Sequence, residues 1–232
     1  MDRNILIIGG SSGIGLALVK KLVDQGDKVT VISRNPGPLT TLPVTHIAAD
    51  VLTDDLKQLD LPDSLDGVVY CPGSITLKPF RSLKAAQFRE DYELNVVGAV
   101  NSLQATQRAL KASKVGSVVL FSTVAVGQGM PFHSSIAAAK GAVEGFTRSL
   151  AAEWAPRIRV NCIAPSLTDT PLAAKLLSTD EKKEASANRH PLRKVGEAED
   201  IAGLALFLLS EQSNWISGQV IGIDGGMSTL RV

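Results

Sequence analysis

Short apolar runs alternate with longer amphipathic stretches along the whole chain. The short runs are rich in β-branched residues, and they predict strands at 4–10, 28–33, 44–49, 65–71, 116–122, 157–164 and 218–224. Several of these runs are almost continuously apolar, which is typical of strands in a sheet that is covered on both faces. Between the strands, a helical spacing of apolar residues predicts helices at 13–26, 84–112, 135–155 and 197–210.

This alternation predicts an α/β fold with a parallel sheet, because a helix that joins two parallel strands crosses over the sheet. The 232 residues contain no internal repeat, low-complexity segment or linker, so we expect a single domain. Residues 171–196 are more charged than the rest of the chain, and they are compatible with a mobile helical flap over a site.

The composition is that of an ordinary globular enzyme, with 44% hydrophobic and 20% charged residues. A formal net charge of +1 without a long basic run argues against nucleic-acid binding by bulk electrostatics. Cys71 and Cys162 lie far apart in apolar runs, and we expect them to be buried thiols in a reducing compartment. The segment MDRNILIIGG is too short for a transmembrane helix and lacks a cleavage site, so we expect a soluble cytoplasmic protein that does not enter a membrane.

A glycine-rich turn lies between the first predicted strand and the first predicted helix, in IIGGSSGIGLALVKKLVDQG. Gly9 permits a tight turn, Gly13 lets the backbone approach a pyrophosphate, and Gly15 allows the helix to pack closely on the sheet. The free N–H groups and the positive dipole end of the helix favour a bound phosphate. The turn therefore predicts a dinucleotide site, to which we assign Gly9, Ser11, Ser12, Gly13 and Ile14.

The end of the second predicted strand, ISRN, indicates which dinucleotide binds. A site for NAD has an aspartate or glutamate here, which holds the ribose 2′-hydroxyl. This chain has Ser33 and Arg34 instead, and Arg34 can pair with a 2′-phosphate in a charge-assisted bond. The sequence therefore favours NADP(H) as the cofactor, and we expect no metal ion.

Together with four further segments, these features resemble the short-chain dehydrogenase/reductase family over essentially the whole chain. The turn GGSSGIG matches the family's cofactor turn, NVVGAV resembles its helix with a buried asparagine, and GQVIGIDGG resembles its last strand. AADV resembles its adenine site, which implies that Asp50 and Val51 frame the adenine. RVNCIAPSLTDTP resembles the end of its sixth strand, which implies that Pro165, Thr168 and Thr170 lie near the nicotinamide and phosphates.

The resemblance implies a Rossmann-type, doubly wound sheet of seven parallel strands in one domain. It also implies hydride transfer between the nicotinamide and a small carbonyl or alcohol substrate. Members of the family form homodimers or homotetramers on two long helices, and we expect the same here. Small residues along 135–155, among them Ala138 and Gly145, favour such an interface because they let another helix approach closely.

Two segments around the predicted cofactor site differ from the family pattern. After the fourth strand, the family's Asn-Asn-Ala-Gly is replaced by Tyr70, Cys71, Pro72 and Gly73. The retained glycine still lets the backbone pass the ribose, so the resemblance assigns residues 71–73 to the cofactor site. After the sixth strand, the family's Pro-Gly is replaced by Pro165 and Ser166.

The largest departure concerns the catalytic residues. The family has a serine after strand five, a tyrosine thirteen residues later and a lysine four residues after that, and these positions hold Thr123, Ile136 and Lys140. In the family the tyrosine exchanges a proton with the substrate oxygen, the lysine lowers its pKa and holds the ribose, and an asparagine, here Asn95, anchors a water chain. Thr123 can still donate a hydrogen bond, but Ile136 cannot move a proton.

Several groups are candidates to replace the missing acid. His133 is the strongest by chemistry, because imidazole titrates near neutral pH, and it precedes Lys140 by seven residues in the loop before the helix. Lys140 itself can act through a water that fills the space of a phenol. Tyr70 and Tyr92 are weaker candidates, and we expect Tyr92 to pack in the core.

The other two histidines, His46 and His190, are surrounded by no motif, and we expect them at the surface. The leading hypothesis is an NADP(H)-dependent oxidoreductase with an atypical proton-transfer site at Ile136. The alternative is a catalytically silent NADP(H)-binding sensor or partner subunit, in which an apolar Ile136 lies against the nicotinamide.

Overall fold

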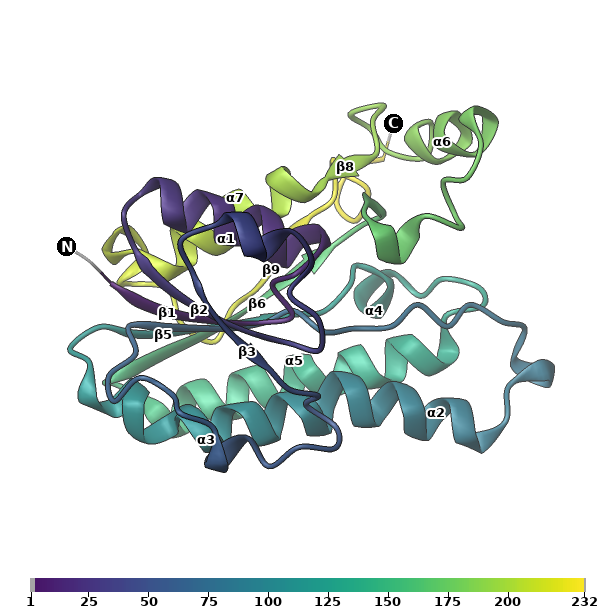
Figure 1. Cartoon of the computed structure of the whole chain (residues 1–232). Coiled ribbons are helices and arrows are strands. Elements are labelled where there is room, and N and C mark those ends of the chain that lie inside the picture. The colour runs from purple at the N-terminus through teal and green to yellow at the C-terminus, as the bar shows by residue number, and fades with distance from the viewer. Residues whose placement is uncertain (1–2, 232) are drawn as a thin grey trace.

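A parallel sheet forms the middle layer of the computed structural model, which describes residues 3–231 (Figure 1). Its seven strands are β1 (Asn4–Ile8), β2 (Lys28–Ser33), β3 (Thr45–Ala48), β4 (Gly67–Tyr70), β5 (Gly116–Phe121), β6 (Ile158–Pro165) and β9 (Val220–Ile223). They are ordered β3-β2-β1-β4-β5-β6-β9, and each pairs in parallel with its neighbours. This arrangement confirms the doubly wound, Rossmann-type fold of a single domain.

Helices cover both faces of the sheet, as Figure 1 shows. One face is covered by α1 (Gly13–Asp24) and α7 (Ala198–Leu209), and the other by α3 (Gly98–Ala112) and α5 (Ser134–Trp154). The helix that we predicted over 84–112 is not continuous, because a π-helical turn at Glu93–Val97 separates α2 (Ala85–Tyr92) from α3. Such turns interrupt the regular hydrogen bonding of a helix and often lie at functional sites.

Strand β1 shows why the strand sequences are continuously apolar. Successive side chains of a strand point to opposite faces, so Ile5 and Ile7 pack in the core against α1 and α7. Leu6 and Ile8 pack in the second core, against α3 and α5. All four side chains are at most 1% exposed. A central strand of this sheet therefore has no face on which a polar side chain meets water.

The charged segment 171–196 is closed at its base by a pair of strands that the sequence did not predict. These strands, β7 (Thr168–Asp169) and β8 (Gly196–Glu197), pair in parallel. Between them lies α6 (Asp180–Ala187), which projects beyond the sheet at the end where the chain also terminates (Figure 1). The segment is thus helical in part, and its mobility stays a prediction.

Three expected side-chain positions outside the cleft were wrong. Tyr92 is 46% exposed, because its neighbour Asp91, which is 2% exposed, takes the inward face of α2. His190 is 2% exposed, since both of its ring nitrogens contact groups within the fold, Ser166 Oγ and Ser186 O. His46 is half-buried, because it lies beside β2 with Nε2 3.0 Å from Ser33 Oγ. Among residues 3–231, no helix combines the length and apolar character that crossing a membrane requires.

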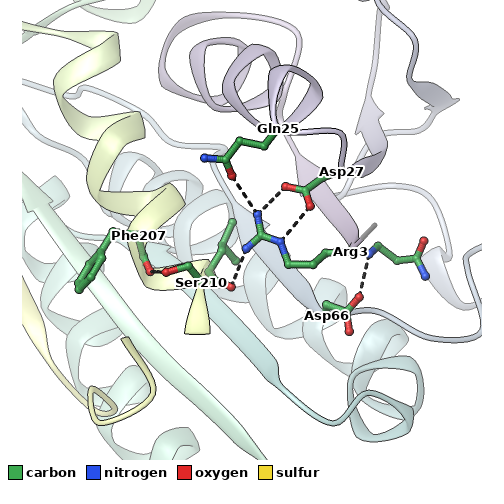
Figure 2. Close-up of polar contacts among 8 residues, drawn as sticks. Arg3, Gln25, Asp27, Asp66, Phe207 and Ser210 are labelled. Atoms are coloured by element: carbon green, nitrogen blue, oxygen red, sulfur yellow. Dashed lines mark hydrogen bonds and ion pairs between the residues drawn. The ribbon is translucent and has the colours of Figure 1, made fainter. Parts of the chain in front are cut away.

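Arg3 directly precedes β1 and joins it to its surroundings (Figure 2). It therefore lies at the end of the sheet where the parallel strands begin. Its Nε and Nη2 donate to the two carboxylate oxygens of Asp27 at 2.9 and 2.5 Å, and its Nη1 donates to Leu209 O at 3.0 Å. Asp27 is only 7% exposed, and the guanidinium of Arg3 contacts both of its carboxylate oxygens. Nearby, the amide of Asn4 donates to Asp66 Oδ2 at 2.8 Å. One guanidinium thus links β1, the turn before β2 and the end of α7.

We expect Arg3→Ala to lower the free energy of unfolding by about 2–3 kcal/mol, because it leaves a buried carboxylate without its partner. Denaturant unfolding of the purified variant measures the change. Lys183→Ala is the control, because its ion pair with Asp169 is half-exposed on both sides and should contribute less than about 1 kcal/mol. Equal effects of the two changes would contradict the structural role of Arg3.

Candidate active site

A cleft of about 1150 Å³ opens along the carboxyl ends of the strands. It is lined by every residue that we assigned to cofactor binding or catalysis except Asn95. These lining residues are Gly9, Ser11, Ser12, Gly13, Ile14, Ser33, Arg34, Asp50, Val51, Cys71, Pro72, Gly73, Thr123, His133, Lys140, Pro165, Thr168 and Thr170. Residues from distant parts of the chain meet here because parallel strands all end at one edge of the sheet.

The glycine-rich turn brings α1 very close to the end of β1. Gly9 has a φ of +80°, which only glycine adopts readily. A side chain at Gly15 would place its Cβ 2.3 Å from Gly9 O, so the helix can pack this closely only without one. Ser12 caps the helix without a side-chain hydrogen bond, and the first turn has no acidic residue. The N-terminal amide groups of α1 are therefore left for an anion, which fits a dinucleotide phosphate.

The end of β2 forms another part of the cleft wall. Ser33 is buried, and its Oγ donates to Asn35 O at 2.9 Å. Arg34 is exposed, and no carboxylate in residues 3–231 forms an ion pair with it. The guanidinium is therefore available to an anionic group bound in the cleft.

Lys140 reaches the cleft from α5. It is 8% exposed, and its Nζ donates to Phe121 O at 2.9 Å. Burial lowers the pKa of Lys140 to about 8, although nearby Cys162, Cys71 and Asp91 act in the opposite direction. The ammonium form still predominates at neutral pH, so this lysine can hold a hydroxyl group of a ligand as a charged donor. Thr123, at the end of β5, lines the same cleft.

Asn95 lies behind this surface, in the π-helical turn. Its Nδ2 donates to Asp91 O at 2.7 Å and to Ser74 Oγ at 3.0 Å. Its Oδ1 is buried without a partner. A Cβ at Gly73 would lie 3.4 Å from both Asn95 Oδ1 and Lys140 Nζ, so the missing side chain keeps this space open. An unpaired buried acceptor beside an ammonium is a site where a water molecule would be held.

Ile136 lines the cleft one helical turn before Lys140 and is 5% exposed. Neither tyrosine of the chain lies in the cleft. The Oη of Tyr70 donates to Leu94 O at 2.6 Å, and burial raises the pKa of this phenol. Tyr92 points outward on α2. The idea that one of them reaches into the site therefore finds no support in the geometry.

Two further groups line the cleft, a histidine that can form a hydrogen bond with a ligand and a thiol that is a poor nucleophile. His133 is half-buried at the residue before α5, as expected, and its Nδ1 is 2.7 Å from Pro131 O. Since a carbonyl only accepts, this bond leaves Nε2 free to accept or donate. Cys71 is half-buried rather than buried, and desolvation raises the pKa of its thiol to about 12. A thiol that stays protonated is a poor nucleophile. Cys162 is fully buried, as expected.

The sequence did not reveal a buried polar network around Asp91. Its Oδ1 accepts from Ser74 Oγ at 2.6 Å and Thr76 Oγ1 at 2.9 Å, and its Oδ2 accepts from Ser135 Oγ at 2.6 Å. The carboxylate thus ties α2 and the loop after β4 to the start of α5, which carries Lys140. The sign of this network in the sequence was an aspartate four residues before Asn95.

A second feature that the sequence did not reveal is a contact between a residue before the 171–196 segment and a residue within it. Ser166 lines the cleft directly after β6, and its Oγ lies 2.8 Å from Nε2 of the buried His190. The replacement of a glycine by Ser166 was visible in the sequence, but its partner was not.

Comparison with known proteins finds similar sequences and the same fold over nearly the whole chain. Residues 9–228 match the family model described as enoyl-(acyl carrier protein) reductase. A tropinone reductase homolog from Arabidopsis thaliana is 34% identical, over 97% of this chain and 92% of its own. Aldohexose dehydrogenase from Thermoplasma acidophilum superposes with a TM-score of 0.91 and 27% identity, over 99% of this chain and 95% of its own. A structure of an ElxO variant with NADPH bound superposes with a TM-score of 0.90 and 25% identity, over 99% of this chain and 100% of its own.

The family match thus extends from the glycine-rich turn through the residues after β9. It covers the turn, the lysine of α5 and the six strands of the sheet that follow β1. The chain belongs to the short-chain dehydrogenase/reductase family of oxidoreductases.

Proposed function

We propose that the protein is an NADP(H)-dependent oxidoreductase that transfers hydride between the nicotinamide and a small carbonyl or alcohol, with an atypical proton-transfer site at Ile136. The observation that carries this proposal is the single cleft that contains the phosphate-binding turn, Arg34, Thr123 and Lys140. When bound, the dinucleotide would supply or accept the hydride. The protein would bind it, orient the substrate and manage the proton.

Each part of the cleft has its own role in the proposed reaction. The amides at the start of α1 bind the pyrophosphate, Asp50 and Val51 frame the adenine, and Thr168 and Thr170 lie beside the nicotinamide end. Lys140 holds the ribose, and Thr123 donates a hydrogen bond to the substrate oxygen. Leu172 and Leu176 of the 171–196 segment also line the cleft, which supports a substrate-covering role for that segment.

The choice of NADP(H) rests on Arg34. The end of β2 offers no carboxylate that would hold a 2′-hydroxyl and repel a 2′-phosphate. The guanidinium of Arg34 lines the cleft without an ion-pair partner among the described residues. ElxO, which shares this fold, has been solved with NADPH, and this supports the same cofactor here.

A second candidate function is a catalytically silent NADP(H)-binding sensor or partner subunit. The apolar Ile136 beside Lys140, with no phenol in the cleft, favours it. Turnover separates the two functions, because both require NADPH binding but only the first consumes NADPH in the presence of a carbonyl.

Assembly into a homodimer or homotetramer through α5 is also part of the proposal. Ala138 and Gly145 are exposed on this helix, and a Cβ at Gly145 would meet no atom within 4 Å. An open strip of small residues lets a second helix approach closely. Other small residues of the helix, such as Ala139, are buried within the same subunit and do not contribute.

The first prediction concerns cofactor choice. NADPH should bind at least about tenfold more tightly than NADH, which corresponds to about 1.4 kcal/mol. Arg34→Ala should remove most of this preference and leave NADH affinity unchanged, because only the 2′-phosphate contacts the guanidinium. Fluorescence titration measures both affinities. Arg108→Ala, which removes an exposed arginine outside the cleft, should change neither. Equal affinity of the unmodified protein for the two cofactors would contradict a preference for NADP(H).

The second prediction concerns Ile136. Ile136→Tyr places a phenol one turn before Lys140, whose charge lowers the pKa of that phenol. NADPH-dependent reduction of reactive ketones should rise, by up to about 10²–10⁴-fold, as expected for a general acid. Ile136→Phe is the matched control, with the same ring and no hydroxyl. If all three proteins bind NADPH and none reduces any ketone of a broad panel, the silent-binder hypothesis prevails.

The third prediction concerns assembly. Light scattering at micromolar concentration should show a dimer or tetramer. Gly145→Arg should reduce the assembled fraction, because it fills the open strip with a long charged side chain, whereas Arg108→Ala should not. A monomer at this concentration, or assembly that tolerates Gly145→Arg, would contradict an interface on α5.

A further inference from the structure

Ser166 and His190 form a hydrogen-bonded pair in the wall of the cleft. Ser166 is half-buried and lines the cleft, and His190 lies behind it with only 2% of its surface exposed. The distance between Ser166 Oγ and His190 Nε2 is 2.8 Å. The hydroxyl is therefore the only part of this pair that a ligand in the cleft can reach directly.

The second nitrogen of His190 determines the direction of this hydrogen bond. Nδ1 lies 2.8 Å from the backbone oxygen of Ser186, and a carbonyl can only accept, so Nδ1 carries a proton. In the neutral ring, Nε2 then accepts the proton of the Ser166 hydroxyl. In the charged ring, Nε2 donates to Ser166 Oγ, and the hydroxyl proton turns to another acceptor. Met227 Sδ, 3.1 Å from Oγ, is such an acceptor, and a substrate oxygen would be another.

The ring of His190 is held by the turn after β9 as well as by Ser186. A Cβ at Gly225 would lie 3.5 Å from His190 Cβ, and Leu192 N donates to Gly225 O at 3.1 Å. The carboxylate of Asp224 lies in the same turn, where it interacts electrostatically with the imidazole. The turn after β9 thus holds His190 in place behind Ser166.

Ser166 also lies next to the residue expected to contact the substrate oxygen. Strands β5 and β6 are neighbours, and Val124 N donates to Pro165 O at 3.2 Å. Thr123 precedes Val124 and Ser166 follows Pro165, so these two residues lie on neighbouring segments of the cleft wall, and Ile136 lines the same cleft. The hydroxyl that replaces the family's glycine and the isoleucine that replaces its tyrosine thus line one cleft.

We propose that Ser166 and His190 form a proton relay that supplies the proton which Ile136 cannot. The relay rests on the proposed function. During reduction, the substrate carbon gains the hydride, the substrate oxygen takes the proton of Ser166 Oγ, and Ser166 takes the proton of His190 Nε2, which leaves a neutral imidazole. During oxidation, each proton moves in the opposite direction. After product release, water in the open cleft returns a proton to His190 through Ser166.

The geometry favours this pair over His133. His133 is half-exposed at the start of α5, and its one hydrogen bond in the structure joins it to a carbonyl two residues away. Nε2 of His190 instead lies within hydrogen-bond distance of a hydroxyl that lines the cleft, and its Nδ1 is held by the backbone oxygen of Ser186. Histidine at a fixed tautomer behind a hydroxyl is the arrangement that activates serine in proton transfer.

The first test needs no cofactor or substrate. Two-bond proton–nitrogen NMR of the three histidines should show that the neutral form of His190 carries its proton on Nδ1, and His190→Gln assigns its signals. Ser166→Ala should shift the Nε2 resonance of His190, because it removes the hydrogen-bond donor. Ser210→Ala, at the opposite end of the sheet, should not. A neutral ring that carries its proton on Nε2 instead of Nδ1, or no shift in Ser166→Ala, would overturn the relay.

The second test separates proton transfer from binding. Ser166→Ala should lower kcat for ketone reduction by about 10²-fold and leave the Kd of NADPH unchanged, while Ser166→Thr, which retains a hydroxyl, should recover most of the rate. His190→Gln can still donate a hydrogen bond to Ser166 but cannot transfer a proton, so its kcat should fall as well. Ile136→Tyr should raise the rate by a larger factor in the Ser166→Ala background than in the unmodified protein, because a phenol then replaces the lost donor.

The outcomes distinguish the relay from the function on which it rests. An active protein whose kcat is unaffected by Ser166→Ala overturns the relay and leaves the proposed function standing. Loss of activity in His133→Ala but not in Ser166→Ala would assign the proton to His133. An unmodified protein that binds NADPH and reduces no carbonyl overturns both.

Discussion

The parallel direction of all seven strands is the constraint on which the rest of the structure depends. A parallel sheet needs a crossover after each strand, and the crossovers place helices on both faces. The strand interiors then have no contact with water, so polar side chains collect where the strands end. The ends of β1, β2, β4, β5 and β6 lie along one edge, and the cleft is formed from the residues at these ends.

Within the cleft, burial has opposite effects on the groups that could carry charge. It lowers the pKa of Lys140 toward neutrality, and it raises the pKa of Cys71 far above it. The thiol is therefore chemically silent, whereas the lysine remains a cation with few neighbours of opposite charge. The apolar side chain of Ile136 makes this part of the cleft wall less polar and contributes no proton. The proposed relay of Ser166 and His190 would supply this proton, since the histidine behind the hydroxyl gives the serine a group from which to recover its own proton.

Buried polar side chains hold the helices in place around this site. Asp91 accepts hydrogen bonds from three hydroxyl groups, one of which belongs to Ser135 at the start of α5. At the opposite edge of the sheet, Arg3 pairs with the buried Asp27. Such groups are costly to bury without their partners, so each of them specifies one arrangement of the elements that it joins.

Local patterns in the sequence determined most of the fold. Continuous apolar runs, helical spacing and the glycines of the first turn depend on neighbouring residues, and they were sufficient to predict the strands, the main helices and the position of the phosphate-binding turn. Only the tertiary structure decided the surroundings of residues that such patterns do not describe. Tyr92 was expected inside and lies outside, because the phase of α2 turns Asp91 inward instead. His190 was expected at the surface and lies buried against Ser166, because its burial depends on β6, the 171–196 segment and the turn after β9, which come together only when the chain is folded. The physical reason is the range of the interactions: periodicity records which face of an element is apolar, whereas a hydrogen bond between distant residues leaves no periodic trace in the sequence.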